Sequence, residues 1–203
     1  MSSAPEGNGT GLESGDAPLD PESLYKPPAQ KTVSEILQKD QEDESLRKYK
    51  EQLLGSSCAS GKIEIEPGNP KNVLVRSLAL VVEGRPDVVM DFSQGAQACS
   101  SFVIKEGAQY RLRIQFHVQR EIVAGLKYVQ KVYRKGLPVD KDEYMVGSYP
   151  PREEIHSFLT PIDEAPSGMI HRGQYRVKSM FTDDDGQQWL AWEWDLDIKK
   201  DWQ

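Results

Sequence analysis

The chain has 203 residues, a formal net charge of −7 and a hydrophobic share of 37%. Excess negative charge repels phosphate backbones, so this composition excludes nucleic acid as an expected partner and favours a basic protein surface. The two cysteines, Cys58 and Cys99, show no metal-ligand spacing. The sequence has no signal-peptide pattern and no apolar run near about 18 residues. It therefore predicts a soluble, cytoplasmic protein with no stable membrane insertion.

Residues 1–24 are predicted to form a disordered acidic leader. This segment is rich in Gly, Ser, Pro, Asp and Glu and contains few large apolar residues. Through Gly61 the sequence has 11 acidic and 6 basic residues, a net charge of −5. Such a composition buries too little apolar surface to offset the conformational entropy lost on ordering.

Residues 25–60 are predicted to form a flexible regulatory arm with two short helices. Thr32 and Glu35 fit a capping box for the first helix, and the second begins at Asp43 and ends before Gly55. Helices this short are marginal in isolation. Two interpretations stay open: docking on the protein's own domain, or folding as a hairpin on a partner, which the polar flanks favour. The stripe that would dock comprises Leu46, Tyr49 and Leu53.

Residues 61–203 are predicted to form one β domain. Short apolar or alternating segments recur between turn residues, and no long helical pattern interrupts them. This arrangement predicts an all-β, two-sheet antiparallel sandwich. The expected strands cover Val73–Val82, Val88–Phe92, Ser101–Ile104, Tyr110–Val118, Leu126–Arg134, Tyr144–Tyr149 and Ile155–Thr160, followed by a hairpin over Tyr175–Asp201.

Two indoles stand on one face of the last hairpin. Trp192 and Trp194 share the parity of Leu190, Leu196 and Ile198, whereas the residues between them are mostly charged. Two interpretations stay open here as well. The pair is either ordinary core, or the wall of a pocket for an apolar ligand between the two sheets.

Candidate catalytic and metal sites are poorly supported. The three histidines are far apart in sequence without ligand spacing, and no Gly-x-Ser-x-Gly elbow occurs. We therefore expect a protein that is not an enzyme and uses no metal or cofactor. The run Asp183 to Asp185 could contact a cation or a basic partner, although an ordinary acidic turn is favoured. A basic run is expected to be a solvated strand face: Lys127, Lys131, Arg134 and Lys135.

Several long strings closely resemble the Rho GDP-dissociation inhibitor family. The resemblance runs from Tyr25 to Trp202 and does not include the acidic leader. It implies an immunoglobulin-like sandwich that takes up the geranylgeranyl group of a Rho- or Rac-type GTPase. The arm would bind the GTPase switch regions, hold the GDP state, block exchange and extract the GTPase from membranes. The strings are YKPPAQK (25–31), DESLRKYK (43–50), LLG (53–55), REIV (120–123), YMVGSY (144–149), FLTP (158–161), FTDDD (181–185), WEW (192–194) and IKKDW (198–202).

The resemblance also implies site residues. Those expected to bind the isoprenoid are Leu80, Phe102, Tyr110, Ile122, Val177, Trp192 and Trp194. Those expected to contact the GTPase are Asp43, Tyr49, Leu53, Leu54, Asp163, Glu164 and Asp185. An alternative function is a general lipid chaperone whose arm is only a lid. An enzyme is the weakest alternative, since no nucleophile, base or metal set is clustered.

Overall fold

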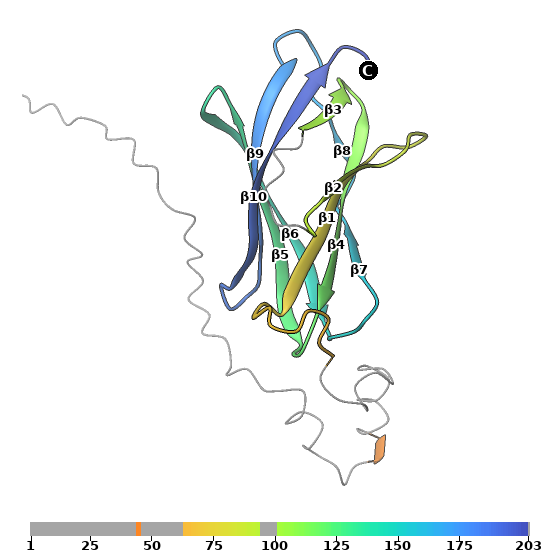
Figure 1. Cartoon of the computed structure of the whole chain (residues 1–203). Helices are drawn as coiled ribbons and strands as arrows, with labels where there is room; N and C mark the ends of the chain where they lie inside the picture. The colour runs from red at the N-terminus through yellow and green to blue at the C-terminus, as the bar shows by residue number, and fades with distance from the viewer. Residues whose placement is uncertain (1–43, 46–62, 94–100, 203) are drawn as a thin grey trace, which may run out of the picture.

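The computed structural model describes residues 44–45, 63–93 and 101–202 of the chain. Over the two longer ranges the protein is a sandwich of two β-sheets (Figure 1). The predicted all-β sandwich of two sheets is confirmed. The predicted arm helices lie almost entirely outside the described residues, apart from one helical stretch at Glu44 and Ser45.

The first sheet has the strand order β2-β1-β4-β7, and β8 pairs separately with the beginning of β4. All of its pairings are antiparallel. A register shift between Val75 and Ser77 marks a bulge in the pairing of β1 with β4. The strands are β1 (Val73–Val81), β2 (Val88–Asp91), β4 (Gln109–Val118), β7 (His156–Leu159) and β8 (Asp163–Glu164).

The second sheet has the order β3-β10-β9-β5-β6. Its last two strands in sequence form the predicted antiparallel hairpin, with Trp194 opposite Val177. One pairing differs from the antiparallel prediction, because β3 lies parallel to β10 at the sheet edge. The strands are β3 (Ser101–Lys105), β5 (Val123–Arg134), β6 (Leu137–Tyr149), β9 (Gly173–Thr182) and β10 (Gln188–Lys199).

Side-chain alternation along the strands builds the core between the sheets. On β4 every second residue from Leu112 to Val118 is buried, and on β9 the same holds from Tyr175 to Phe181. Period-two alternation places these side chains on one face, where they meet the opposite sheet. The two sheets thus share one continuous hydrophobic core.

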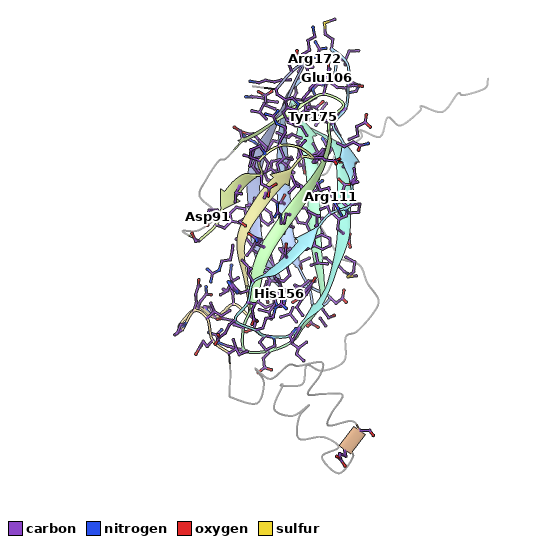
Figure 2. All side chains as sticks on the ribbon, turned by 90° about the vertical axis from the view of Figure 1, so that its right-hand side faces the viewer. Asp91, Glu106, Arg111, His156, Arg172 and Tyr175 are labelled. Atoms are coloured by element: carbon purple, nitrogen blue, oxygen red, sulfur yellow. The ribbon has the colours of Figure 1, made fainter. Side chains whose placement is uncertain are left out.

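The sandwich has two distinct ends. At the proximal end the described chain enters at residues 63–72, and the turn between β9 and β10 lies there as well. At the distal end the described chain ends, at residue 202 (Figure 1). Figure 2 shows Glu106 and Arg172 at the distal end and His156 toward the proximal end.

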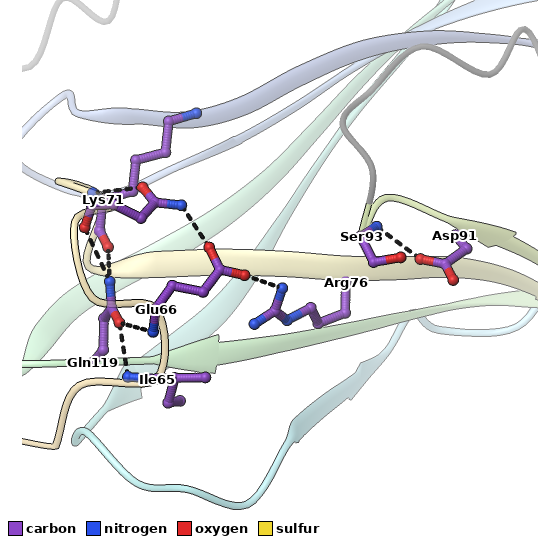
Figure 3. Close-up of polar contacts among 8 residues, drawn as sticks. Ile65, Glu66, Lys71, Arg76, Asp91, Ser93 and Gln119 are labelled. Atoms are coloured by element: carbon purple, nitrogen blue, oxygen red, sulfur yellow. Dashed lines mark hydrogen bonds and ion pairs between the residues drawn. The ribbon is translucent and has the colours of Figure 1, made fainter.

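A buried glutamine fastens the entering segment to the proximal end (Figure 3). Gln119 is fully buried, and its Oε1 accepts hydrogen bonds from the backbone N–H groups of Ile65 and Glu66, each at 3.0 Å. Its Nε2 donates to the carbonyl oxygens of Lys71 at 2.6 Å and Asn69 at 3.3 Å. Residues 63–71 fall within the predicted β domain, and these bonds attach them to it.

Candidate functional site

The inner face of β10 forms an aromatic wall. Trp192 and Trp194 are only 4% and 2% exposed. The ring of Trp194 lies 5.2 Å from Phe102, and that of Trp192 lies 5.2 Å from Phe92 and 5.9 Å from Tyr128. Large aromatic surfaces at these separations pack favourably and offer an extended apolar contact. Because almost none of either indole is exposed, a ligand could touch the wall only if neighbouring side chains moved.

The two indoles differ in how their polar atoms are satisfied. Trp194 Nε1 donates to Ser179 Oγ at 2.9 Å. Trp192 Nε1 is buried and has no hydrogen-bond partner among the described residues. A buried donor without an acceptor costs roughly 1–3 kcal/mol. A hydrogen bond therefore holds the Trp194 indole in place, whereas the indole N–H of Trp192 lacks an acceptor among the described residues.

A buried polar network leads from the wall toward the edge strand β6. The hydroxyl groups of Tyr128 and Ser179 are 2.9 Å apart, and Tyr128 also donates to Gln130 Oε1 at 3.1 Å. Gln130 Nε2 donates in turn to Asp142 Oδ2 at 2.8 Å. Ser179, Gln130 and Asp142 are cross-strand neighbours on β9, β5 and β6. The inner face of the sheet thus changes from aromatic to acidic along one row.

The edge of the sandwich beside β6 is acidic and aromatic. Tyr110, at the start of β4, donates its hydroxyl to Asp163 Oδ2 on β8 at 2.7 Å. Burial raises the pKa of Tyr144 to about 12, and the charges of Asp142, Asp163 and Asp140 add to that rise. Burial also raises the pKa of the Asp142 carboxyl, helped by Asp140 and Asp163 and opposed by the Gln130 hydrogen bond. We call Tyr110, Asp140, Asp142, Tyr144 and Asp163 the acidic edge.

The acidic turn between β9 and β10 stands at the proximal end. Asp183 is 5% exposed; its Oδ1 accepts the N–H groups of Asp185 and Gln187, and its Oδ2 accepts the indole N–H of Trp189 at 2.9 Å. Asp183 thus holds the turn together. Asp185 is exposed. The Lys71 ammonium donates to the Trp189 carbonyl at 2.6 Å, which ties the entering segment to the same turn.

Close packing supports the outer part of this turn. Asp184 forms an ion pair with Lys127 at 2.8 Å. Gly125 has φ +61°, and a Cβ added there would lie 1.8 Å from Asp184 Oδ2. The sequence therefore needs glycine at this position on β5, both for its left-handed backbone and for the approach of Asp184.

Most of the residues expected to bind the isoprenoid come together. Five belong to one buried cluster, and Tyr110 packs against it from the acidic edge. Ile122 follows the end of β4 at the proximal end, whereas Tyr110 lies at the distal start of the same strand. At about 3.3 Å per residue, the length of β4 separates them by roughly 30 Å. The five clustered residues are Leu80, Phe102, Val177, Trp192 and Trp194.

The residues expected to contact the GTPase fall in three places. Asp163 and Glu164 are exposed on β8, opposite Tyr110 and Gln109. Asp185 stands on the proximal turn. The other four, in the arm, lie outside the described residues: Asp43, Tyr49, Leu53 and Leu54.

Reading the sequence missed the inward-facing residues of β6. Asp140, Asp142 and Tyr144 share one parity, and Gln130 fixes that parity as inward. Charged residues stand on both faces of this strand, so its hydrophobic pattern did not show which face turns inward. The only available signal was the shared parity of two aspartates and a tyrosine beside an apolar partner strand.

Within residues 44–45, 63–93 and 101–202 we find no helix of the length and apolar character needed to cross a bilayer. In the same ranges no group of three or more His, Cys, Asp or Glu side chains is arranged to hold a metal ion.

Comparison with known proteins shows which family this chain resembles. The sequence model described as "RHO protein GDP dissociation inhibitor" matches residues 13–201, so the likeness starts before Tyr25, inside the leader. Human Rho GDP-dissociation inhibitor 1 is 53% identical over 181 residues, covering 88% of this chain and 86% of that protein. Human Rho GDP-dissociation inhibitor 3 is 47% identical over 181 residues, covering 88% and 78%.

More distant relatives extend the comparison. The Caenorhabditis elegans protein named "Probable rho GDP-dissociation inhibitor" is 46% identical over 183 residues, covering 89% of this chain and 94% of that protein. The family match spans nearly the whole chain, including both sheets and the acidic turn. The chain therefore belongs to the Rho GDP-dissociation inhibitor family.

Proposed function

We propose that this protein is a Rho GDP-dissociation inhibitor that binds prenylated, GDP-bound Rho-family GTPases and keeps them in the cytoplasm. The observation that carries the proposal is the tryptophan-walled interior that borders an acidic edge. A GTPase with a geranylgeranyl group on a basic C-terminal tail has matching chemistry: isoprenoid for the interior and cations for the edge.

The isoprenoid would lie between the sheets against the aromatic wall. The proposed contacts are Leu80, Phe102, Tyr110, Val177, Trp192 and Trp194. Ile122 stands outside this group, because it lies toward the proximal end.

Burial of the lipid supplies the driving force. At about 0.8 kcal/mol per methylene-sized group, even partial burial of a twenty-carbon isoprenoid contributes on the order of 10 kcal/mol. A membrane offers the same chain a comparable gain. Displacing the side chains that now fill the interior costs part of that energy, so the sandwich competes with lipid without trapping its ligand irreversibly.

The acidic edge would guide the GTPase tail. Asp163 and Glu164 are exposed at the edge, and the partly buried Asp142 adds negative charge behind them. Opposite charges at exposed positions raise the association rate and align the partner more than they raise affinity. Asp185 lies at the proximal end, so a GTPase contacting both Asp163 and Asp185 would extend along the sandwich.

Recognition of the nucleotide state belongs to the arm in this proposal. An isoprenoid pocket has no contact with the nucleotide and so cannot distinguish GDP from GTP. Residues 25–60, including Asp43, Tyr49, Leu53 and Leu54, would fold on the switch regions and block exchange. Because the arm and the sandwich are one chain, the second contact becomes effectively intramolecular. Ordering the arm consumes part of the binding energy, which leaves room for release.

The decisive experiment is extraction from liposomes. Purified protein is mixed with vesicles that carry a prenylated, GDP-loaded Rho-family GTPase, and the supernatant is assayed after sedimentation. We expect the GTPase to move to the supernatant in a one-to-one complex. No extraction would contradict the proposal. Extraction with undiminished nucleotide exchange would favour a lipid chaperone whose arm is only a lid.

A further inference from the structure

The outer face of the second sheet carries a row of three lysines. Lys141 on β6 lies opposite Lys131 on β5, and Lys131 lies opposite Lys178 on β9. All three point away from the core, because the neighbouring Gln130 and Ser179 point inward. We call Lys131, Lys141 and Lys178 the lysine row. Directly opposed like charges destabilise a sheet, so the arrangement calls for a compensating role.

Ordinary structural roles explain only part of the row. Lysines on edge strands prevent sheets from pairing with other chains. Because β6 is an edge strand, Lys141 can serve this purpose. Lys131 and Lys178 stand on interior strands, where no edge needs protection. Lys178 is 3.5 Å from Glu193, but Lys131 and Lys141 form no salt bridge within the described residues.

A hollow adjoins the row. Its volume is about 490 Å³, and Tyr133 and Tyr175 are among the residues that line it. That volume falls in the range of roughly 300–1,000 Å³ usual for small-ligand sites. Lys178 lines the hollow and also lies 5.3 Å from the Tyr133 ring. The other lining residues are Lys135, Gly136, Gln174, Arg176, Glu193 and Asp195.

The rim of the hollow holds a lysine in an unusual conformation. Lys135 has φ +51° and Gly136 has φ +82° in the turn between β5 and β6. Turns with positive φ at both central residues favour Asn, Asp or Gly at the first position. A lysine there accepts backbone strain while bringing a cation to the rim. Acidic groups are also close: Glu193 and Asp195 line the hollow and pair with Lys178 and Arg176, and Glu143 lies opposite Val129.

We propose that the lysine row and the adjoining hollow bind a ligand with two or more phosphate groups, such as a multiply phosphorylated headgroup. Three ammonium groups on adjacent strands, with Lys135 at the rim, match clustered phosphates better than a single carboxylate. The Tyr133 ring, beside Lys178, would support the ring that carries the phosphates. This site lies on the outer face of the sheet, whereas the aromatic wall lies on its inner face.

The test uses the full-length protein alone, so its failure would leave the proposed GTPase binding untouched. Calorimetry measures binding of inositol trisphosphate and of inorganic pyrophosphate. Flotation measures binding to phosphatidylcholine vesicles with and without phosphatidylinositol bisphosphate. The test variant combines Lys131→Gln with Lys178→Gln. The control combines Lys105→Gln with Lys200→Gln, which removes two lysines from the distal end. Thermal unfolding confirms that both variants fold.

We expect saturable binding that the test variant weakens roughly tenfold or more and the control leaves nearly unchanged. Binding to the soluble phosphates and the vesicles would support a headgroup site open to both sources. Binding to vesicles only would support the site and identify the ligand as lipid. Equal weakening by the two variants would overturn the proposal in favour of a general charge effect. Absence of binding to all probes would overturn it as well.

Discussion

Trp194 donates its indole N–H to the hydroxyl oxygen of Ser179, 2.9 Å away, in the middle of the sandwich. The same hydroxyl lies 2.9 Å from that of Tyr128. One small side chain thus satisfies two large aromatic residues on different strands. This bond holds one half of the aromatic wall in place, whereas Trp192 beside it has no such restraint.

Replacing Ser179 by alanine should destabilise the domain. The Ser179→Ala change leaves the buried Trp194 N–H without an acceptor and removes a partner of Tyr128. Each such loss costs roughly 1–3 kcal/mol, and urea unfolding measures the change in free energy. Ser157→Ala, at an exposed position of β7, is the matched control and should change stability by about 0.5 kcal/mol or less. Equal effects of the two changes would show that the Ser179 hydroxyl has no structural role.

Two of the acidic residues of the proximal turn, Asp183 and Asp185, should separate a structural role from a binding role. Asp183→Ala removes the acceptor of Trp189 and of two backbone N–H groups, so it should lower stability by roughly 1–3 kcal/mol or more. Asp185→Ala, at an exposed position, should lower stability less and weaken GTPase binding more. Thermal unfolding and titration with a prenylated GTPase measure both. If Asp185→Ala destabilised as strongly as Asp183→Ala, Asp185 would be structural.

The Asp142 carboxyl should make stability fall as the pH rises. Its folded-state pKa is raised by burial and by Asp140 and Asp163, above the unfolded value near 3.8. Between those two pKa values the native state binds more protons, so stability falls with rising pH and stays lower above that window. Asp142→Asn keeps an acceptor for Gln130 and should therefore be more stable than the parent at pH 7. That advantage should vanish below the unfolded pKa.

Glu106 provides a control of opposite sign. Hydrogen bonds from Arg172 and from the Gly168 N–H lower its pKa from 4.5 to about 2. Its contribution is present above the unfolded pKa and is lost as the pH falls toward about 2. Glu106→Gln should thus be less stable than the parent at pH 7, and the difference should shrink in acid. Parallel pH profiles for the two variants would contradict these assignments.

The sequence predicted most of the strands because their hydrophobic patterns are local. The alternation from Leu190 to Ile198 predicted both the strand β10 and its buried face. The parallel pairing of β3 with β10 escaped prediction, because partners so distant in sequence leave no local pattern. Ser101–Lys105 reads as a strand in either orientation.

The candidate site was predicted less completely. The tryptophan wall follows from parity, but its acidic border on β6 depends on which face of a charged strand turns inward. The hydrogen bonds by which Gln119 attaches the entering segment were also not predicted, because a single buried glutamine has no sequence signature. Its four hydrogen bonds, together with the bond from the Arg120 N–H to the Ile63 carbonyl, tie residues 63–71 to the sandwich.

Removal of residues 1–60 should separate the two parts of the proposed function. The segment that Gln119 and Arg120 bind begins at residue 63, so the truncated protein retains every described contact of the sandwich. We expect its melting temperature and its binding of a geranylgeranylated peptide to stay near those of the full chain. Inhibition of nucleotide exchange, measured with a fluorescent GDP analogue, should be lost. Inhibition that survives the truncation would assign state recognition to the sandwich.

The central claim is that the space before the tryptophan wall opens to admit an isoprenoid. Its most direct test is a nuclear magnetic resonance titration of the full-length protein with a geranylgeranylated peptide, following the four tryptophan indole N–H signals. The account predicts large shifts and direct contacts to the isoprenoid at Trp192 and Trp194. Trp189, bound to Asp183 at the proximal turn, should change little. Saturable binding with unchanged Trp192 and Trp194 signals, or no binding, would contradict the claim.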